Sequence, residues 1–209
     1  MAHYFDPDPE AAHSLRAFTE EVQGQVFRFI SDAGTFSRNR LDFGSRQLVE
    51  AALDLGDFPP GCQILDLGCG WGPVGTILAS FYPQAQLSFC DINERALRQA
   101  MENFNNNCPD QNAQFYLSDG LSQVPFKFDY IFLNPPIRAG KTVVYRLFAE
   151  AHAALNPGGK LMIVVQKKQG AKTTKDELER LFGGPDQVVD LARKAGYRVF
   201  SATKGIKAP

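Results

Sequence analysis

Two short motifs in this chain carry residues whose types and spacing could perform chemistry. The first reads DLGCGWGPVG from Asp66 to Gly75, and the second reads NPPI from Asn134 to Ile137. The first is typical of a turn that holds a nucleoside-bearing cofactor. The second is typical of a rigid turn that presents hydrogen-bond acceptors to an amine. Together they favour an enzyme that transfers a group from a bound cofactor to a nitrogen atom.

The glycine-rich motif predicts a strand, a turn and a helix in succession. The run Gln63–Leu67 has β character, and Pro73 opens a segment of helical periodicity, as proline does in the first turn of a helix. Glycine tolerates positive φ and allows the backbone to approach a ligand, while the helix N-terminus offers free N–H groups and partial positive charge. The turn residues expected to contact the cofactor are Gly68, Cys69, Gly70 and Gly72.

The identity of the cofactor depends on an acid that precedes these glycines. Residues 70–75 also fit the dinucleotide fingerprint G-x-G-x-x-G, so a nicotinamide or flavin enzyme is an alternative. Asp66 lies two residues before the first glycine, where its carboxylate would repel a pyrophosphate. The same carboxylate can face the cationic amino group of a methionine moiety. The motif therefore favours S-adenosylmethionine.

Further cofactor contacts are expected at the ends of the next two strands. Asp91 ends the apolar run that begins at Leu87, and a carboxylate there can accept both ribose hydroxyls. Alternatively, Asp91 only caps the helix that begins near Asn93. Asp119 and Gly120 fit a contact with adenine and an ordinary turn equally well. The cofactor residues expected from these strand ends are Asp91, Ile92, Asp119 and Gly120.

The second motif predicts a clamp for the acceptor nitrogen. The lone pair of an exocyclic amine is delocalised into the ring, so two acceptors on its hydrogens would help to pyramidalise the nitrogen. The side-chain oxygen of Asn134 and the backbone carbonyl of Pro135 could supply them, and Pro135 and Pro136 would stiffen the turn. An isolated Asn-Pro step is also a common loop dipeptide. Its place after the fourth predicted strand favours the catalytic interpretation.

Four segments of the chain resemble a known family. The segments that carry the resemblance are Phe36-Ser37, LDFGS at 41–45, NPPIRAGK at 134–141 and QKKQGA at 166–171. They are similar to the class I methyltransferases that modify exocyclic or amide nitrogens, and more narrowly to the small-methyltransferase family. That family includes the ribosomal RNA small-subunit guanine-N2 methyltransferases, and the resemblance covers roughly residues 17–205. It implies that Phe36, Asp42 and Ser45 lie over the cofactor as a lid, with Asn134 touching both cofactor and substrate.

The resemblance implies S-adenosylmethionine-dependent methylation of guanine in ribosomal RNA. The chain departs from the family in two respects: larger members carry an extra N-terminal domain, and Ile137 stands where an aromatic residue often stacks on the target base. Asn-Pro-Pro turns also occur in enzymes that methylate adenine amines in DNA or glutamine amides in proteins. These two groups are therefore alternative acceptors. A binding module without activity is disfavoured by the intact Asn134.

Charge is distributed unevenly along the chain. The net charge is −1, which is not typical of a strongly basic nucleic-acid binder, but residues 138–180 hold nine lysines or arginines against four acids. These cations follow predicted strand ends, so they could contact an RNA backbone or form an ordinary solvated face. The residues expected to bind substrate are Ile137, Arg138, Lys141, Lys167 and Lys168.

The remaining composition excludes several classes of protein. The four cysteines form no C-x-x-C pair and the three histidines are scattered, so no metal site is expected. The acidic N-terminus lacks the apolar core of a signal peptide, and no apolar run approaches the ~20 residues of a membrane helix. We expect a cytoplasmic protein with reduced thiols, an RNA partner and no membrane.

Alternating strand and helix patterns predict the fold class. A chain of 209 residues favours one α/β domain with a small extension. We expect a Rossmann-like class I methyltransferase fold with a seven-stranded, mostly parallel sheet and a terminal antiparallel hairpin. The extension, residues 1–57, is expected to hold a β-hairpin, the lid and a helix that Ser45 caps, and residues 58–209 to form the methyltransferase domain.

Overall fold

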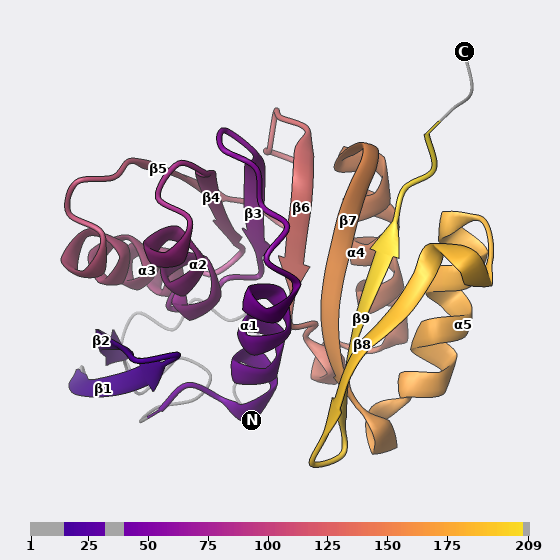
Figure 1. The fold of residues 1–209 in the computed structure, drawn as a ribbon, viewed down its shortest axis with the longest axis horizontal. Coiled ribbons are helices and arrows are strands. Elements are labelled where there is room, and N and C mark those ends of the chain that lie inside the picture. The colour runs from indigo at the N-terminus through magenta and orange to yellow at the C-terminus, as the bar shows by residue number, and fades with distance from the viewer. Residues whose placement is uncertain (1–14, 32–39, 207–209) are drawn as a thin grey trace.

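The computed structural model describes residues 15–31 and 40–206, so Phe36 lies outside the described residues. A seven-stranded sheet in the order β5-β4-β3-β6-β7-β9-β8 forms its centre (Figure 1). The strands are β3 (Gln63–Leu67), β4 (Gln86–Asp91), β5 (Ala113–Leu117), β6 (Phe128–Leu133), β7 (Leu155–Gln166), β8 (Val188–Lys194) and β9 (Tyr197–Thr203). The first five are parallel, and β9 runs antiparallel to both β7 and β8. The predicted fold class is confirmed.

Helices cover both faces of this sheet. They are α1 (Phe43–Leu55), α2 (Pro73–Phe81), α3 (Glu94–Asn107), α4 (Lys141–Ala154) and α5 (Ala171–Phe182), with short 3₁₀ turns η1 (Ile137–Ala139), η2 (Lys167–Gln169) and η3 (Pro185–Gln187). The first three helices contribute to one hydrophobic cluster and the last two to another. In β6, Tyr130 and Phe132 belong to the first cluster, whereas Ile131 and Leu133 belong to the second. This alternation buries both faces of the central strands, as expected of a parallel sheet.

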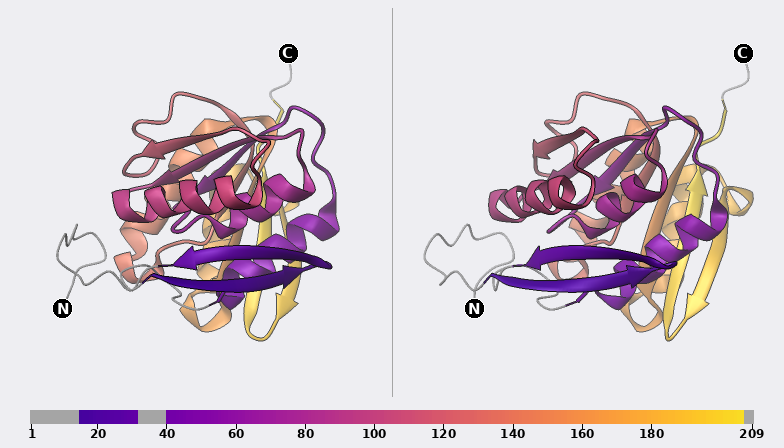
Figure 2. Two further views of the ribbon diagram at one scale, coloured as in Figure 1. Left: turned by 90° about the vertical axis from the view of Figure 1, so that its left-hand side faces the viewer. Right: turned by 60° about the vertical axis from the view of Figure 1, so that its left-hand side comes forward.

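A β-hairpin lies beside the main sheet as a separate two-stranded sheet (Figure 2). It consists of β1 (Arg16–Val22) and β2 (Gln25–Ser31), joined by Gln23 and Gly24, which both have positive φ. Two central residues with positive φ match the twist of antiparallel strands. The predicted hairpin is confirmed, and Phe27 and Phe29 are both buried, with ring centroids 6.0 Å apart.

The predicted cap of α1 was wrong. Asp42, rather than Ser45, is the N-cap residue, and its side chain accepts a hydrogen bond from the Ser45 N–H at 3.1 Å. Both residue types can cap a helix, but only a residue just outside the first turn can reach those N–H groups. Ser45 lies inside the first turn, where its hydroxyl is free to point elsewhere.

Candidate active site

An open cavity lies at the carboxyl ends of β3, β4 and β6, where ligands bind in open α/β sheets. It is lined by Leu67, Gly68, Cys90, Asp91, Ile92, Ser118, Asp119, Gly120, Asn134, Pro136, Val143, Arg146 and Leu147. Seven of these residues were predicted from the sequence: Gly68, Asp91, Ile92, Asp119, Gly120, Asn134 and Pro136. The structure therefore brings both motifs to one cavity.

Asp91 connects the glycine turn to α3. One carboxylate oxygen accepts a hydrogen bond from the Gly70 N–H at 2.8 Å, and the other accepts one from the Asn93 N–H at 2.8 Å. Asn93, rather than Asp91, caps α3. A carboxylate offers about four lone-pair sites, so two backbone bonds leave capacity for ribose hydroxyls. Burial raises the pKa of Asp91, while the backbone hydrogen bonds act in the opposite direction.

Asp66 lies behind the glycine turn and does not line the cavity. Its side chain is only 4% exposed, and one oxygen accepts a hydrogen bond from the Gly75 N–H in the first turn of α2 at 2.9 Å. Burial raises the pKa of Asp66 to about 7, although the Gly75 hydrogen bond lowers it. The carboxylate therefore anchors the helix that follows the turn. Of the other turn residues, Cys69, Gly70 and Gly72 also lie outside the cavity lining.

The side chain of Asn134 is oriented by two residues of the N-terminal segment. Its amide nitrogen donates to the Ser45 hydroxyl at 3.0 Å and to an Asp42 carboxylate oxygen at 3.3 Å. An ionised carboxylate can only accept, so the NH₂ group must face Asp42. The amide oxygen therefore points away from Asp42 and Ser45. The sequence assigned Asp42 and Ser45 to the cofactor lid, whereas the structure brings both to Asn134 and not to the cavity lining.

The two prolines form a compact turn after Asn134. The Pro135 carbonyl accepts a hydrogen bond from the Ile137 N–H at 2.8 Å, and the Pro136 carbonyl accepts one from the Ala139 N–H at 2.9 Å. The Pro135 carbonyl thus keeps one lone pair for a second partner. The side chain of Ile137 packs against the hydrophobic cluster under α4.

An ion-pair network borders the far side of the cavity. Arg146 contacts Asp119 at 2.5 Å and Glu150 at 3.0 Å, and Glu150 also accepts a hydrogen bond from the Leu121 N–H at 2.9 Å. Gly120 has a φ of +58°, and a Cβ atom there would collide with the Glu150 carboxylate. The positive φ favours glycine, and a side chain there would displace the Glu150 carboxylate from this network.

Sequence reasoning missed the contribution of α4 to the cavity. Val143, Arg146 and Leu147 all line it, at the three- and four-residue spacing of one helix face. That spacing was visible in the sequence, but only the fold indicates which face of the helix turns toward the strand ends.

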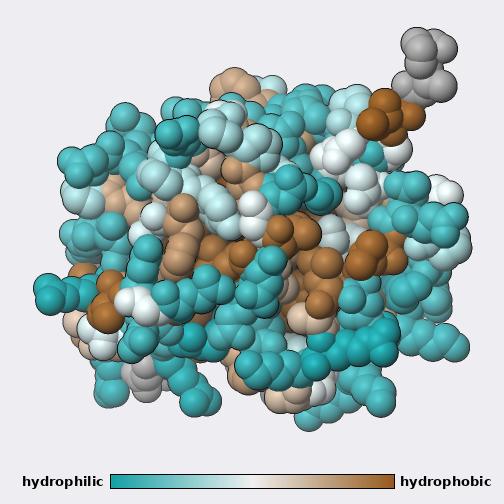
Figure 3. Space-filling view, in the orientation of Figure 1, coloured by the Kyte–Doolittle hydropathy of each residue, from teal (hydrophilic) through white to brown (hydrophobic). Residues whose placement is uncertain are grey.

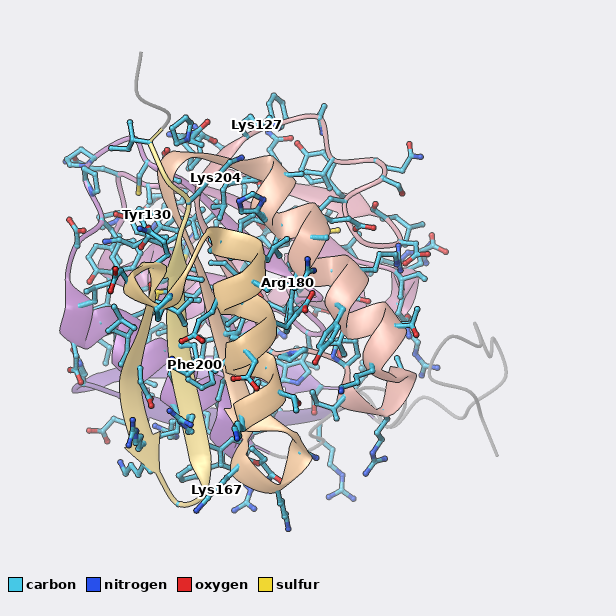
Figure 4. All side chains as sticks on the ribbon, turned by 90° about the vertical axis from the view of Figure 1, so that its right-hand side faces the viewer. Lys127, Tyr130, Lys167, Arg180, Phe200 and Lys204 are labelled. Carbon is cyan, nitrogen blue, oxygen red and sulfur yellow. The ribbon has the colours of Figure 1, made fainter. Side chains whose placement is uncertain are left out.

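The basic residues expected to bind substrate lie outside the cavity. Lys167 and Lys168 are exposed in η2, which directly follows β7. Arg138 is exposed within η1, and Lys141 is exposed at the start of α4. In Figure 4, Lys167 lies at the opposite end of the molecule from Lys127 and Lys204. Among residues 15–31 and 40–206, no ion-pair partner is found for Lys167 or Lys168.

Apolar and polar residues are unevenly distributed over the surface. On the face shown in Figure 3, apolar residues gather mainly in the middle, with polar residues around them.

No group of three or more potential metal ligands is found among the described residues. Within the same part of the chain, no helix combines the length and apolarity needed to cross a membrane.

Comparison with known proteins identifies the family. The model for the methyltransferase small domain matches residues 26–201. The chain belongs to this family. It is 38% identical over 97% of its length to the uncharacterized protein YbxB of Bacillus subtilis (strain 168), covering 98% of that protein. It is 34% identical to the ribosomal RNA large subunit methyltransferase G of Psychromonas ingrahamii, over 80% of this chain and 44% of that protein.

A solved structure agrees with this family assignment. A 16S rRNA N2 methyltransferase from T. Thermophilus, in complex with AdoMet and guanosine, superposes with a TM-score of 0.79 at 27% identity. The match covers 94% of this chain and 52% of that one. The chain thus spans about half the length of these two rRNA methyltransferases.

Family membership confirms the prediction that the chain is an S-adenosylmethionine-dependent methyltransferase. The alternative interpretation, a dinucleotide-dependent oxidoreductase, was wrong. The cavity fits this cofactor, because a partly buried carboxylate, Asp91, stands at a strand end beside apolar walls from Leu67 and Val143. Such a combination suits the hydroxyls and the flat base of a nucleoside.

Proposed function

We propose that this enzyme methylates an exocyclic amine of a base, with guanine in ribosomal RNA as the first candidate. The observation that carries the proposal is the orientation of Asn134. With its NH₂ group bound to Asp42 and Ser45, its oxygen is available to accept a hydrogen bond from a substrate amine. An acceptor held in place before the substrate arrives has little reorganisation to undergo during the reaction.

The proposed mechanism relies on positioning. The Asn134 oxygen accepts one N–H of the amine, and the remaining lone pair of the Pro135 carbonyl accepts the other. Both bonds draw the nitrogen out of conjugation with the ring and direct its lone pair at the cavity. S-adenosylmethionine, when bound, would supply an electrophilic methyl group and leave as the neutral thioether S-adenosylhomocysteine, while the methylated nitrogen would release one proton to water. Holding the two reactants in line then provides much of the catalysis.

We assign the cofactor contacts as follows. Asp91 accepts the ribose hydroxyls, Asp119 and Gly120 border the adenine, and the backbone of Gly68, Cys69, Gly70 and Gly72 surrounds the methionine portion. Asp66 supports the turn from behind through its bond with the Gly75 N–H, and when ionised it adds negative charge near the methionine amino group. Asp42 and Ser45 act at the site through their contacts with Asn134, and the lid role expected of Phe36 concerns a residue outside the described part of the chain.

Ribosomal RNA is favoured as the substrate by the names of the relatives. The protein of Psychromonas ingrahamii is a ribosomal RNA large subunit methyltransferase, and the T. Thermophilus protein methylates 16S rRNA at N2. An RNA substrate also suits the exposed cations of Arg138, Lys141, Lys167 and Lys168. We propose a cytoplasmic location on the same ground. A DNA adenine amine and a protein glutamine amide are the alternative acceptors.

The test is nucleoside profiling of RNA by mass spectrometry. Ribosomal RNA from cells that lack the protein should have lost one N-methylated guanosine. The wild-type gene should restore this nucleoside, whereas the matched variant Asn134→Ala should not. An unchanged RNA profile together with a lost methyl mark on DNA or on a protein would contradict the proposed substrate.

A further inference from the structure

The proposed reaction requires a surface on which the acceptor base can stack. A base that reaches Asn134 must leave its neighbours in the RNA, and proteins commonly compensate this loss with aromatic side chains. Ile137, the residue beyond the two prolines, has no aromatic ring, and its side chain packs against the core under α4. The stacking surface must therefore come from another element.

An aromatic pair lies near the nitrogen side of the Asn134 amide. Phe43 begins α1 and is 38% exposed, and Tyr197 begins β9 and is partly exposed. Their ring centroids are 5.2 Å apart, with the planes inclined by 45°. In Figure 1, the start of α1, the end of β6 and the β8–β9 turn lie toward the same end of the sheet.

Gly44 shows how close these groups are. A Cβ atom at Gly44 would lie 3.2 Å from a Tyr197 ring carbon, 3.1 Å from an Asp42 carboxylate oxygen and 3.5 Å from the Asn134 amide nitrogen. The tyrosine ring and the asparagine amide are thus both within 3.5 Å of one point. A Cβ atom at Gly44 would be unusually close to the Tyr197 ring and the Asp42 carboxylate, so glycine suits this tight packing.

The tyrosine ring is also held in position. Gln166, at the end of β7, donates a hydrogen bond to the Tyr197 hydroxyl, and the two residues are register partners in the sheet. The next residue, Lys167, donates its backbone N–H to the Gly196 carbonyl at 2.7 Å. The ring therefore adjoins the exposed basic pair Lys167 and Lys168, which could contact a phosphate of the same nucleotide.

We propose that Tyr197 and Phe43 form the aromatic surface on which the acceptor purine stacks while Asn134 holds its amine. The ligand of this subsite is a flat purine base extruded from single-stranded or locally opened RNA. This inference rests on the proposed function, because it assigns the position of the base whose amine is methylated.

The test compares two substitutions at one position. Tyr197→Leu retains apolar bulk but removes the aromatic face, whereas Tyr197→Phe retains the face and removes only the hydroxyl. Phe43→Leu is the second variant, and Phe126→Leu is the control, because Phe126 is 53% exposed but precedes the amino end of β6. Each full-length protein is assayed with ribosomal RNA from cells lacking the enzyme and radiolabelled S-adenosylmethionine, and cofactor affinity is measured by calorimetry.

Stacking on one aromatic side chain contributes about 1–3 kcal/mol, so Tyr197→Leu should lower kcat/KM for RNA about 5- to 150-fold. Most of that loss should appear in KM for RNA. The kcat/KM values of Tyr197→Phe and Phe126→Leu should stay near that of the wild type. The value for Phe43→Leu should lie between those of the wild type and Tyr197→Leu, and the affinity for the cofactor should not change in any variant.

Two results would overturn the stacking inference alone, and a third would overturn the proposed function on which it rests. Unaltered kinetics in Tyr197→Leu would contradict stacking at this position. A loss in Tyr197→Phe as large as that in Tyr197→Leu would show that the hydroxyl and its bond to Gln166 matter, and not the aromatic face. A wild-type enzyme that binds S-adenosylmethionine but methylates no RNA would refute the proposed function itself, and with it the stacking surface.

Discussion

At the scale of single residues, the orientation of one amide decides what the acceptor clamp can do. Asn134 could present either its oxygen or its nitrogen to a substrate, and these have opposite hydrogen-bonding character. Asp42 removes the ambiguity because a carboxylate has no proton to offer. The hydroxyl of Ser45, which can donate or accept, cannot do so alone. The chain thus uses an N-cap residue of α1 to set the polarity of a side chain at the end of β6.

This polarity gives a prediction for Asp42→Asn. Asparagine caps a helix about as well as aspartate, so α1 should form normally. Its own amide can donate, however, so the Asn134 side chain can turn over and direct its nitrogen at the substrate amine. We expect a fall in kcat of about 10- to 100-fold, below the full cost of losing a preorganised group.

Single-turnover kinetics measure this effect, with Ser45→Ala as the matched control. The control removes one hydrogen bond to the Asn134 amide but leaves the carboxylate that fixes its orientation, so its rate should fall less. Equal rates in the two variants would contradict the orienting role of Asp42.

The buried Asp66 predicts a pH dependence of stability. Its pKa is raised from 3.8 to about 7 in the folded protein, chiefly by burial. The folded state therefore holds the proton more tightly than the unfolded state, and this stabilisation is lost as pH rises from about 4 to about 7. One unit of pKa corresponds to about 1.4 kcal/mol.

Chemical denaturation of the cofactor-free protein at several pH values measures this contribution of Asp66 to stability. The free energy of unfolding of the wild type, minus that of Asp66→Asn, should decrease between pH 4 and pH 7 and level off above. A difference that stays constant across this range would mean that Asp66 is ionised throughout.

At the scale of elements, the N-terminal hairpin supports the glycine turn. Trp71, within that turn, packs against Phe18 and Phe29 of the hairpin, with ring centroids 5.5 and 4.9 Å away. Asn103 of α3 donates to the carbonyls of Trp71 and Ile30 at 2.8 and 2.9 Å, and accepts from the Ile30 N–H at 2.8 Å. One buried amide therefore joins α3, the hairpin and the cofactor turn.

We expect Asn103→Ala to loosen the glycine turn. It leaves the buried carbonyl of Trp71 without this donor, which typically costs about 1–3 kcal/mol. Cofactor affinity should fall, and the fluorescence of Trp71, the only tryptophan of the chain, should shift toward that of an exposed indole.

Asn107→Ala is the control for this experiment. Asn107 bonds the N–H and the carbonyl of Arg28 in the hairpin but has no bond to Trp71. Its substitution should leave the fluorescence and the cofactor affinity unchanged. If both variants altered the two signals equally, Asn103 would serve only to attach the hairpin.

Elements and long-range contacts differ in how far the sequence predicts them. Strands such as Phe128–Leu133 are short apolar runs next to turn residues, and Gln23-Gly24 between β-like runs indicates a hairpin, so local patterns suffice. Contacts such as Asn134 with Asp42 join residues far apart in sequence, and neither residue carries a local sign of its partner. The cavity positions in α4 depend likewise on how that helix rotates against the sheet.

At the scale of the whole molecule, charge is separated in a way that suits RNA. The chain is close to neutral, yet residues 138–180 carry an excess of basic side chains. Some of these are neutralised locally, as Arg146 is by Asp119 and Glu150. Lys167 and Lys168 are exposed beyond the end of β7. They are the cations best placed to meet a phosphate backbone near Tyr197.

Charge reversal of this pair should weaken RNA binding. For single-stranded RNA, the logarithm of affinity falls with the logarithm of salt by about 0.7 for each phosphate neutralised. The double variant Lys167→Glu and Lys168→Glu should bind RNA less tightly. The slope of the logarithm of affinity against the logarithm of salt concentration should become shallower by about one to one and a half.

RNA binding titrations across a range of salt concentrations measure this slope. Reversal of Lys127, at the opposite end of the molecule, is the control and should leave the slope unchanged. Affinity that responds neither to salt nor to the double reversal would favour a protein acceptor.

The central claim is that Asn134 holds the acceptor amine and contributes little to cofactor binding. Its most direct test is single-turnover methyl transfer to ribosomal RNA by Asn134→Ala, together with calorimetry of S-adenosylmethionine binding. We expect the rate to fall by about 10²- to 10³-fold, as when one preorganised group is removed from an active site, with cofactor affinity close to that of the wild type. Methyl transfer at the wild-type rate without Asn134, or a loss of rate fully explained by weakened cofactor binding, would contradict it.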